Sequence, residues 1–297
     1  IVVKFEKKDT PQKVNIKLFR QGAKDIRLND TKISQKELIG TLNTVIFCPE
    51  DLQLIKGTPS GRRRFLDMEI SQTSATYYHQ LMQYNRLLQQ RNAVLKEYRG
   101  KNNIPLEEWD LQLADMASFI VKKRLESLKK INLLIDLMNR KLTGGLENLT
   151  IGYEQPYMDN GSLEYTKQGF YERIKAALPQ DRHRLSTSVG PHRDDLRFFS
   201  DAMDLKKFGS QGQQRTAVLS LKLSELEFIK SEVGEYPVLL LDDVLSELDE
   251  SRRVNLLQFI HKRIQTFITT TDIHDFKDLK SVQFISCEGG NVQYGQP

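Results

Sequence analysis

Cysteine, long apolar runs and metal-ligand clusters are scarce or absent in this sequence. Its 297 residues include two cysteines, Cys48 and Cys287, which lie far apart, so a disulfide framework is excluded and a reducing compartment is expected. Neither a CxxC pair nor a Cys/His cluster at zinc-site spacing occurs. No apolar run approaches the roughly 18 residues that span a bilayer, and no signal peptide opens the chain. We expect a soluble, cytoplasmic protein without a membrane partner.

Glycine and proline are also sparse, with 17 and 9 residues, and the remaining composition is that of an ordinary folded chain. Hydrophobic residues make up 39% and charged residues 28%, and a chain of this length predicts one or two domains. The formal net charge of +5 and the isoelectric point near 9.0 fit a polyanionic partner. Many basic proteins bind no nucleic acid, so charge alone does not identify one.

Strand-like and helical patterns alternate along the first half of the chain. Three short segments are typical of strands: Ile1–Glu6, Val14–Phe19 and Asn43–Cys48. From Thr73 to Leu142 the apolar residues recur at helical spacing, in two runs separated by the polar loop Arg99–Asn103. Because a glycine pair ends the second run, we predict a helical hairpin whose longer helix reaches roughly 50 Å.

The last section of the chain has the pattern of an α/β sheet. A long helical pattern precedes an apolar strand, a short helix and two further strands: Gln211–Lys230, Val238–Leu241, Thr266–Thr270 and Val282–Ser286. Strands that alternate with helices favour an α/β fold with parallel members in a mixed β-sheet. We predict an ATPase-type lobe formed by residues 1–70 and 186–297, with a mainly helical second lobe, residues 71–185, inserted between them.

One motif combines a glycine-containing turn with the start of a helix. In Phe208-Gly-Ser-Gln-Gly-Gln-Gln-Arg215, Ser210 is a good helix N-cap and Gly212 allows a phosphate to approach the backbone. Free N–H groups at a helix start bind anions, and Gln213 and Arg215 add side-chain donors. Taken alone, the segment is more typical of a capped helix after a turn.

A second motif places two carboxylates at the end of a buried strand. Asp242 and Asp243 follow the apolar run Val238–Leu241, at the strand end where open α/β sheets bind ligands. One carboxylate can hold Mg²⁺, usually through water, and the other can orient or deprotonate an attacking water. A solvated acidic turn is the alternative interpretation.

The order and spacing of three motifs make the prediction specific. Ser246-Glu-Leu-Asp249 follows the acidic pair and by itself is only a helix-entry sequence. Together the three resemble the signature motif, Walker B strand and D-loop of the ABC-ATPase class. That resemblance implies ATP held between two protomers, with Ser210, Gln211, Gly212 and Gln213 reaching the nucleotide of the opposite subunit.

Within that class the chain resembles the RecF family over nearly its whole length. The resemblance is carried by four stretches: residues 45–52 (VIFCPEDL), residues 56–67 (KGTPSGRRRFLD), residues 87–92 (LLQQRN) and residues 190–195 (GPHRDD), together with the SQGQQR form of the signature. It implies an ATP-induced homodimer that binds duplex or gapped DNA at single-strand/double-strand junctions and promotes recombinase loading. RecR, and RecO through it, are the implied protein partners.

The same resemblance assigns roles to the acidic residues. Asp242 is expected to position Mg²⁺ through water, Asp243 to act on the attacking water, and Ser246 and Asp249 to couple the two ATP sites. Transporter ATPases usually have glutamate where Asp243 stands. The shorter side chain predicts slow, DNA-stimulated hydrolysis, suited to a clamp.

The chain departs from the family pattern in three places. No G-x-x-x-x-G-K-[ST] loop occurs, so we expect a missing N-terminal segment to carry it and this chain alone to be inactive. Thr271 stands where transporters place a switch histidine, and His274 nearby is more typical of a surface helix. The glutamine-loop residue stays open between Glu50, Asp51 and Gln53.

Basic residues cluster where DNA contacts are expected. The candidates are Lys56, Arg62, Arg63, Arg64, Arg99 and Lys101. Such clusters bind phosphates with little sequence preference and strong salt dependence. A solvated face is the alternative for any single residue, and Arg62–Arg64 and Arg91 fit internal ion pairs equally well.

Three rival functions compete with this interpretation. A transporter nucleotide-binding subunit is disfavoured by the basic hairpin, Asp243 and the absent switch histidine. A structural tether of the SMC or Rad50 kind needs coiled coils of hundreds of residues, and this hairpin has a few tens. A DNA-binding module without catalysis fits a chain that lacks the phosphate loop.

Overall fold

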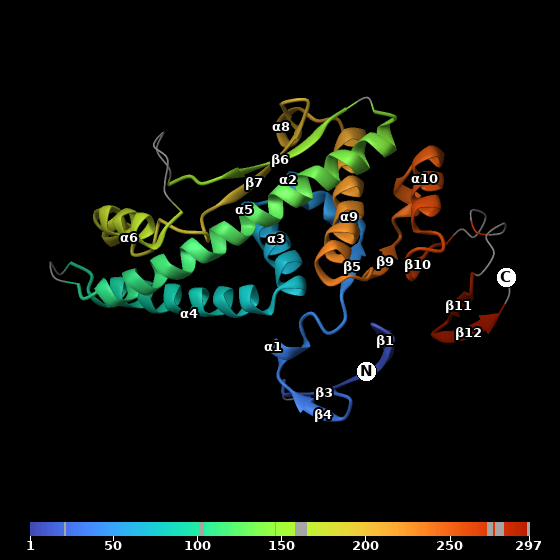
Figure 1. Ribbon diagram of the computed structural model, residues 1–297, viewed down its shortest axis with the longest axis horizontal. Helices are drawn as coiled ribbons and strands as arrows, with labels where there is room; N and C mark the ends of the chain where they lie inside the picture. Colours follow the sequence, from blue (N-terminus) through green and yellow to red (C-terminus); the bar gives the residue numbers. More distant parts are fainter. Residues whose placement is uncertain are drawn as a thin grey trace.

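The computed structural model describes residues 1–20, 22–100, 104–145, 147–157, 165–271, 276 and 282–295. A long helical hairpin extends to one side, one sheet runs alongside its longer helix, the other large sheets lie toward that helix's other end, and a small C-terminal hairpin lies farthest from the helical hairpin's tip (Figure 1). No helix among these residues is long and apolar enough to cross a membrane. Lys101 and His274 lie outside the described residues.

The N-terminal segment forms a four-stranded antiparallel sheet in sequence order. Its strands are β1 (Val2–Lys7), β2 (Thr10–Leu18), β3 (Lys24–Leu28) and β4 (Thr31–Ile33). Two of its turns have two central residues at positive φ, Lys8-Asp9 and Asn29-Asp30. This geometry matches the twist of a hairpin, and Asn and Asp tolerate it best among residues other than glycine. The sequence predicted β1 and β2 but not β3 and β4. A short helix, α1 (Gln35–Leu38), follows with a Ser34–Glu37 capping box.

The predicted parallel sheet is confirmed, with β9 at its centre. Its order is β10 (Thr266–Thr269), β9 (Val238–Asp242) and β5 (Thr44–Phe47), and both pairings are parallel. Alternate residues on one face, such as Val45 and Leu239, are buried in the main core, whereas Ile46 and Phe267 are about half exposed on the other. The carboxyl ends of all three strands therefore meet at one edge.

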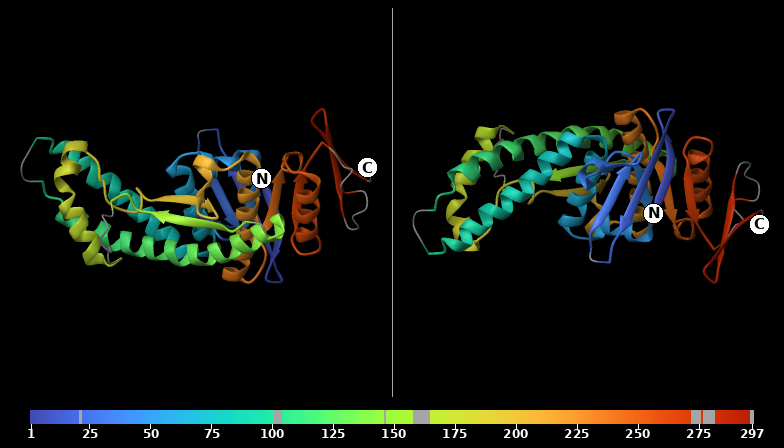
Figure 2. Two further views of the ribbon diagram at one scale, coloured as in Figure 1. Left: turned by 90° about the horizontal axis from the view of Figure 1, so that it is seen from above. Right: turned by 90° about the horizontal axis from the view of Figure 1, so that it is seen from below.

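Six helices in the described part of the chain lie beside this sheet or form the hairpin that extends from it. They are η1 (Pro49–Leu52), α2 (Gln53–Lys56), α3 (Pro59–Thr73), α4 (Ala75–Glu97), α5 (Glu107–Thr143) and α9 (Gln211–Val233). The predicted hairpin is confirmed as α4 packed along α5, and α5 also crosses α9 (Figures 1 and 2). Gly144 ends α5 with a positive φ of 66°, which leaves α5 with 37 residues and a length of about 56 Å. The sequence did not predict α3.

The remaining elements flank these two parts. A three-stranded sheet runs beside α5 and consists of β6 (Leu149–Glu154), β7 (Asp195–Ser200) and β8 (Met203–Asp204). The helices are α6 (Lys167–Ala176), α7 (Leu178–Arg184), α8 (Leu205–Phe208), η2 (Leu245–Glu247) and α10 (Glu250–Ile260). The predicted terminal strand is the first of a hairpin, β11 (Phe284–Glu288) and β12 (Asn291–Gly295), seen at the C-terminal end in Figure 2.

Candidate functional site

The signature motif forms an exposed helix start. Ser210 is the N-cap of α9, and its hydroxyl accepts a hydrogen bond from the Gln213 N–H at 3.2 Å. The Gln213 carboxamide oxygen accepts in return from the Ser210 N–H at 3.0 Å, which completes a capping box. Ser210 and Gln211 are exposed. The helix is therefore fully formed at its N-terminus and presents the positive end of its dipole to solvent.

Gln213 is already engaged within the chain. Its side-chain NH₂ donates to Glu147 at 3.1 Å, and Glu147 also accepts from Ser200 at 3.1 Å. The side chain that the motif assigns to a ligand is therefore tied to the α5–β6 connection in this conformation.

Two glycines of the motif differ in what surrounds them. A Cβ at Gly209 would lie 2.6 Å from the Leu205 carbonyl oxygen, so packing inside the chain requires glycine there. A Cβ at Gly212 would meet only the Ser210 hydroxyl, at 3.9 Å. Glycine inside a helix is unfavourable by about 0.5–1 kcal/mol relative to alanine. Packing within this chain gives no reason for it at position 212.

The acidic pair lies at the carboxyl edge of the parallel sheet. The Thr269 hydroxyl on β10 donates to the Asp242 carboxylate at 2.6 Å and accepts from the Asp243 N–H at 3.1 Å. Asp243 has a positive φ of 52°, a backbone state that Asp adopts more readily than most residues. Asp242 and Asp243 are both exposed. The edge thus presents two carboxylates to solvent beside a fixed hydroxyl.

The third motif turns the chain from this edge into α10. Ser246 donates to the Asp243 carbonyl at 2.8 Å, and Asp249 caps α10 by accepting from the Arg252 N–H at 2.9 Å. Leu245 and Leu248 are buried beneath the turn. Asp249 also pairs with the Arg252 guanidinium at 2.9 Å, so this loop is held by its own contacts.

The loop after β5 connects the sheet edge to the middle of α9. The buried Lys222 ammonium pairs with Asp51 at 3.3 Å and with Glu225 at 3.4 Å. Gln53 is exposed, as is Thr271 after β10. Of the three candidates for the glutamine-loop position, Asp51 forms an ion pair with the helix that begins at Ser210.

Burial raises the pKa of two carboxyl groups near Lys222, those of Glu69 and Glu225. Desolvation raises the pKa of Glu69 to about 7, an effect that Lys222 partly offsets. It also raises the pKa of Glu225 well above its ordinary value. Burial alone would lower the pKa of Lys222, but Glu225 and Asp51 raise it overall. Sequence reasoning missed the cluster, although charged residues spaced three apart inside the apolar run of α9 were a signal.

Residues of the other stretches that resemble the RecF family form ion pairs with one another inside the protein. Arg62 forms a bidentate ion pair with Asp195, at 2.7 and 2.8 Å. Arg91 is fully buried and bonds Asp110 and Asp181 at 2.6 Å and Thr187 at 2.9 Å. Arg62, Arg91 and the buried Asp194 and Thr187 therefore join α3, α4, α5, α7 and the start of β7, whereas Arg193 in the same stretch is exposed.

His192 extends this network in its neutral form. Its Nε2 lies 3.0 Å from the Thr187 carbonyl, which can only accept, so Nε2 carries the proton and Nδ1 accepts from the Tyr84 hydroxyl at 2.6 Å. Desolvation lowers the pKa of His192 to about 4. Gly190 has a φ of 130°, and a Cβ there would lie 2.4 Å from the Tyr84 oxygen.

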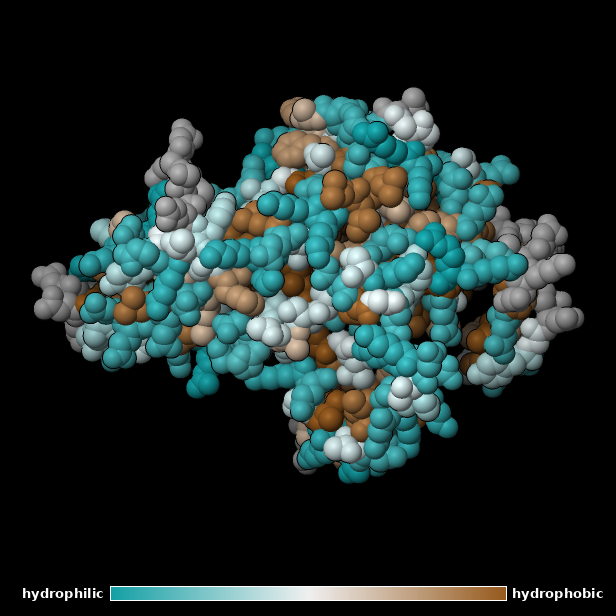
Figure 3. Space-filling model, in the orientation of Figure 1, coloured by the Kyte–Doolittle hydropathy of each residue, from teal (hydrophilic) through white to brown (hydrophobic). Residues whose placement is uncertain are grey.

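The predicted DNA contacts differ in exposure. Lys56, Arg64 and Arg99 are exposed, Arg63 is half-buried and donates to the Asp194 carbonyl at 2.7 Å, and Arg62 is buried. Hydrophilic residues cover most of the hairpin on the face seen in Figure 3.

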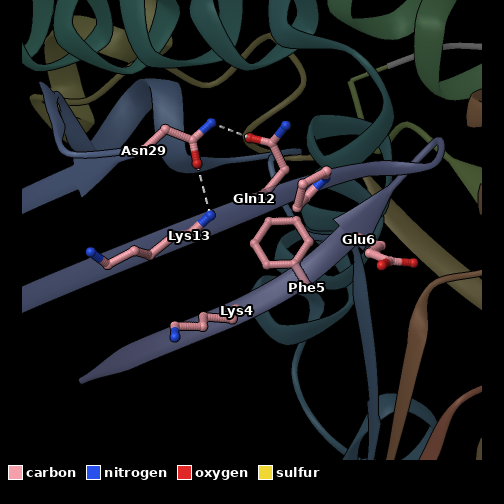
Figure 4. Close-up of a pocket in the computed structure, with 7 residues that line it drawn as sticks. Lys4, Phe5, Glu6, Gln12, Lys13 and Asn29 are labelled. Carbon is pink, nitrogen blue, oxygen red and sulfur yellow. Dashed lines mark hydrogen bonds between the residues drawn. The ribbon is translucent and has the colours of Figure 1, made fainter.

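A shallow hollow on the four-stranded sheet contains Phe5 between Lys4 and Lys13 (Figure 4). Its polar rim bonds to itself, since Asn29 donates to Gln12 at 2.8 Å and accepts from the Lys13 N–H at 2.8 Å. Among the residues described, no group of three or more His, Cys, Asp or Glu is placed to hold a metal ion.

Comparison with known proteins identifies the family. No family model matches the chain. The DNA replication and repair protein RecF of Alkaliphilus oremlandii (strain OhILAs) is 46% identical over 283 residues, which are 94% of this chain and 77% of that protein. This chain belongs to the RecF family. The RecF protein of Halothermothrix orenii (strain H 168 / OCM 544 / DSM 9562) is 44% identical over 282 residues, 93% of this chain and 75% of the relative.

Solved structures agree. The recombination mediator protein RecF-ATP in the RecFOR pathway matches with a TM-score of 0.87 and 35% identity, over 97% of this chain and 77% of that one. An SMC head bound to the C-winged helix domain of ScpA matches with a TM-score of 0.54 and 13% identity, over 99% and 72% of the two chains, which shows the fold alone. The predicted RecF membership and ABC-ATPase-like fold are confirmed.

Proposed function

We propose that this RecF-family chain forms an ATP-induced homodimer that clamps DNA and hydrolyses ATP slowly, as a cytoplasmic protein of recombinational repair. Membership of the family supports a role in DNA repair and the binding of ATP. Its relatives are named for DNA replication and repair, and a RecF structure has been solved with ATP. RecR, and RecO through it, are the proposed partners in loading recombinase. The observation that carries the proposal is the fully formed start of α9, where Ser210 and Gln211 are exposed.

The lengths of two elements favour a composite ATP site. The 23-residue helix α9 is about 34 Å long, and the chain then turns into β9, whose 5 residues cover only about 17 Å. Asp242, at the end of β9, therefore reaches about half-way back toward Ser210. We infer from these lengths that one triphosphate does not bridge both residues of one chain, whereas a second chain can present its Ser210 to the nucleotide beside Asp242.

The same geometry suits Mg²⁺ at the sheet edge. Mg²⁺ in nucleotide sites uses one or two carboxylates, phosphate oxygens and retained waters. Asp242 is exposed and held by Thr269 through one oxygen, so its second oxygen is available to the ion or to a bound water. When bound, Mg²⁺ would neutralise phosphate charge, while Asp243 orients the attacking water. The chain contains no G-x-x-x-x-G-K-[ST] loop, so we expect these 297 residues alone to hydrolyse little ATP.

The proposal is tested at Ser210, because its capping and ligand roles can be separated. Ser210→Asp keeps a good N-cap but puts a carboxylate against the phosphates, Ser210→Ala removes the cap at a cost of about 1 kcal/mol, and Ser210→Arg blocks the approach. We expect the full-length Ser210→Asp and Ser210→Arg proteins to remain monomeric with ATP. The Ser210→Ala protein should dimerise with ATP more weakly than the parent.

The measurement is analytical ultracentrifugation with and without ATP, with circular dichroism as the fold control. A Ser210→Arg protein that dimerises with ATP as readily as the parent would contradict the composite site. A parent protein that does not dimerise on addition of ATP would also contradict the composite site.

A further inference from the structure

A pocket of about 350 Å³ lies between α3, α4 and the loop at residues 191–192. Its wall combines cations, an aromatic ring and apolar side chains. Six lining residues matter here: Arg63, Arg64, Met68, Tyr78, Leu81 and Asn85. A volume in this range is at the small end of ligand pockets. It suits a single small unit rather than a folded partner.

The pocket is positively charged after its internal pairs are counted. Four charged residues line it, Arg63, Arg64, Arg124 and Asp67. Arg124 pairs with the lining Asp67 at 2.9 Å and lies 3.5 Å from the buried Asp194 carboxylate behind the wall, and the lining His192 is neutral. Arg63 and Arg64 are left facing the cavity. The pKa of Arg63 is lowered by burial and by the nearby charge of Arg124, and Asp195, Asp194 and Asp67 offset this only in part.

Several side chains in this wall can donate hydrogen bonds to a ligand, because they form few or no hydrogen bonds within the described part of the chain. Within the described part of the chain, Arg63 forms one side-chain hydrogen bond, and Arg64, Tyr78 and Asn85 form none. Tyr78 is half-buried, and Met68 is 44% exposed. An arginine pair beside an aromatic ring and apolar side chains is the combination that binds unstacked nucleotides: cations hold the phosphate, and the ring stacks on the base.

We propose that this pocket binds one unstacked nucleotide of a DNA single strand, with its phosphate on Arg64 and Arg63 and its base against Tyr78. The chemistry favours a nucleotide over an acidic peptide, because the apolar wall of Met68 and Leu81 adjoins an aromatic ring on which a base can stack. The proposal rests on the DNA binding proposed above. It adds a contact to an unpaired base, which duplex DNA does not offer.

The test compares three DNAs by fluorescence anisotropy, using the full-length protein with ATP. These are a blunt duplex, the same duplex with a short single-stranded overhang, and that overhang with abasic sites. We expect Tyr78→Ala to weaken overhang binding roughly 10-fold and to leave blunt-duplex binding unchanged. Arg64→Glu should weaken binding to both overhangs, because the abasic strand keeps its phosphates.

Arg86→Glu is the matched control, since it reverses the charge of an exposed arginine on α4 that does not line the pocket. It should lower the affinity for all three DNAs by one common factor. Equal loss on blunt and overhang DNA for Arg64→Glu, or an unchanged overhang affinity for Tyr78→Ala, would overturn the pocket assignment. A parent protein that binds none of the three would instead overturn the proposed DNA binding.

Discussion

At Gly190 the backbone passes so close to Tyr84 that no side chain fits. A Cβ would lie 2.4 Å from the tyrosine oxygen, and the φ of 130° is strained for any other residue. We expect Gly190→Ala to lower the free energy of unfolding by about 2–5 kcal/mol, from overpacking and backbone strain together. Urea denaturation of the parent and Gly190→Ala proteins measures this change in the free energy of unfolding.

Gly61 provides the control for this substitution. It lies within α3, does not have a positive φ, and a Cβ at this position would have no neighbouring atom within 4 Å. Gly61→Ala should therefore stabilise the protein by up to about 1 kcal/mol. Equal effects at the two glycines would show that the approach to Tyr84 is not what requires Gly190.

Glu69 makes stability depend on pH in a defined direction. Its pKa is about 7 in the folded protein and 4.5 as the ordinary value, so between these pH values the folded state binds more protons than the unfolded state. Its contribution is therefore complete below pH 4.5 and is lost as pH rises through about 7. Glu69→Gln keeps the neutral form at every pH.

We expect Glu69→Gln to match the parent protein near pH 5 and to be more stable at pH 8, by at most roughly 3 kcal/mol. Urea midpoints of both proteins at the two pH values give the difference in stability. The contribution of His192 is the same in both proteins and therefore drops out of the comparison. A stability difference that stays constant across this pH range would contradict the protonated, buried Glu69.

At the scale of elements, Arg91 joins α4, α5 and the loop that precedes β7. Its guanidinium pairs with two buried carboxylates, Asp110 and Asp181. Arg91→Ala leaves these charges unpaired and should lower the free energy of unfolding by about 3–5 kcal/mol. Arg86→Ala, on the exposed face of the same helix, should change it by less than about 0.5 kcal/mol. Thermal denaturation of the two variants decides whether Arg91 holds these elements together.

Among the elements that the sequence did not predict, α3 shows a limit of prediction from hydrophobic patterns. Helix α3 buries Arg62, Glu69 and Ser71 beside Leu66 and Ile70. Its buried face is therefore not an apolar stripe, and helical periodicity of hydrophobic residues cannot reveal it. Helices α4 and α5, whose buried faces are mainly apolar, were predicted with ends within a few residues of those observed.

At the scale of the whole molecule, the net charge of +5 predicts salt-dependent DNA binding. Lys56 and Arg99 are exposed, and neither belongs to the internal ion pairs among described residues. Reversing both to glutamate should weaken duplex binding at low salt by about 10-fold or more, and it should reduce the slope of log affinity against log salt by about 2. Titrations at several salt concentrations measure both quantities. Unchanged affinity at low salt would place the DNA elsewhere.

The sequence by itself determined the family, the parallel sheet, the helical hairpin and the placement of three motifs at a helix start, a strand end and a helix entry. Those features depend on local periodicity, capping and spacing, which are written along the chain. Only the tertiary structure decided which charged residues face inward. Arg62 pairs with Asp195 across 133 positions of sequence, while Arg64, two residues further on, stays exposed. Pairing between distant segments sets the cost of burying a charge, and no local pattern contains it.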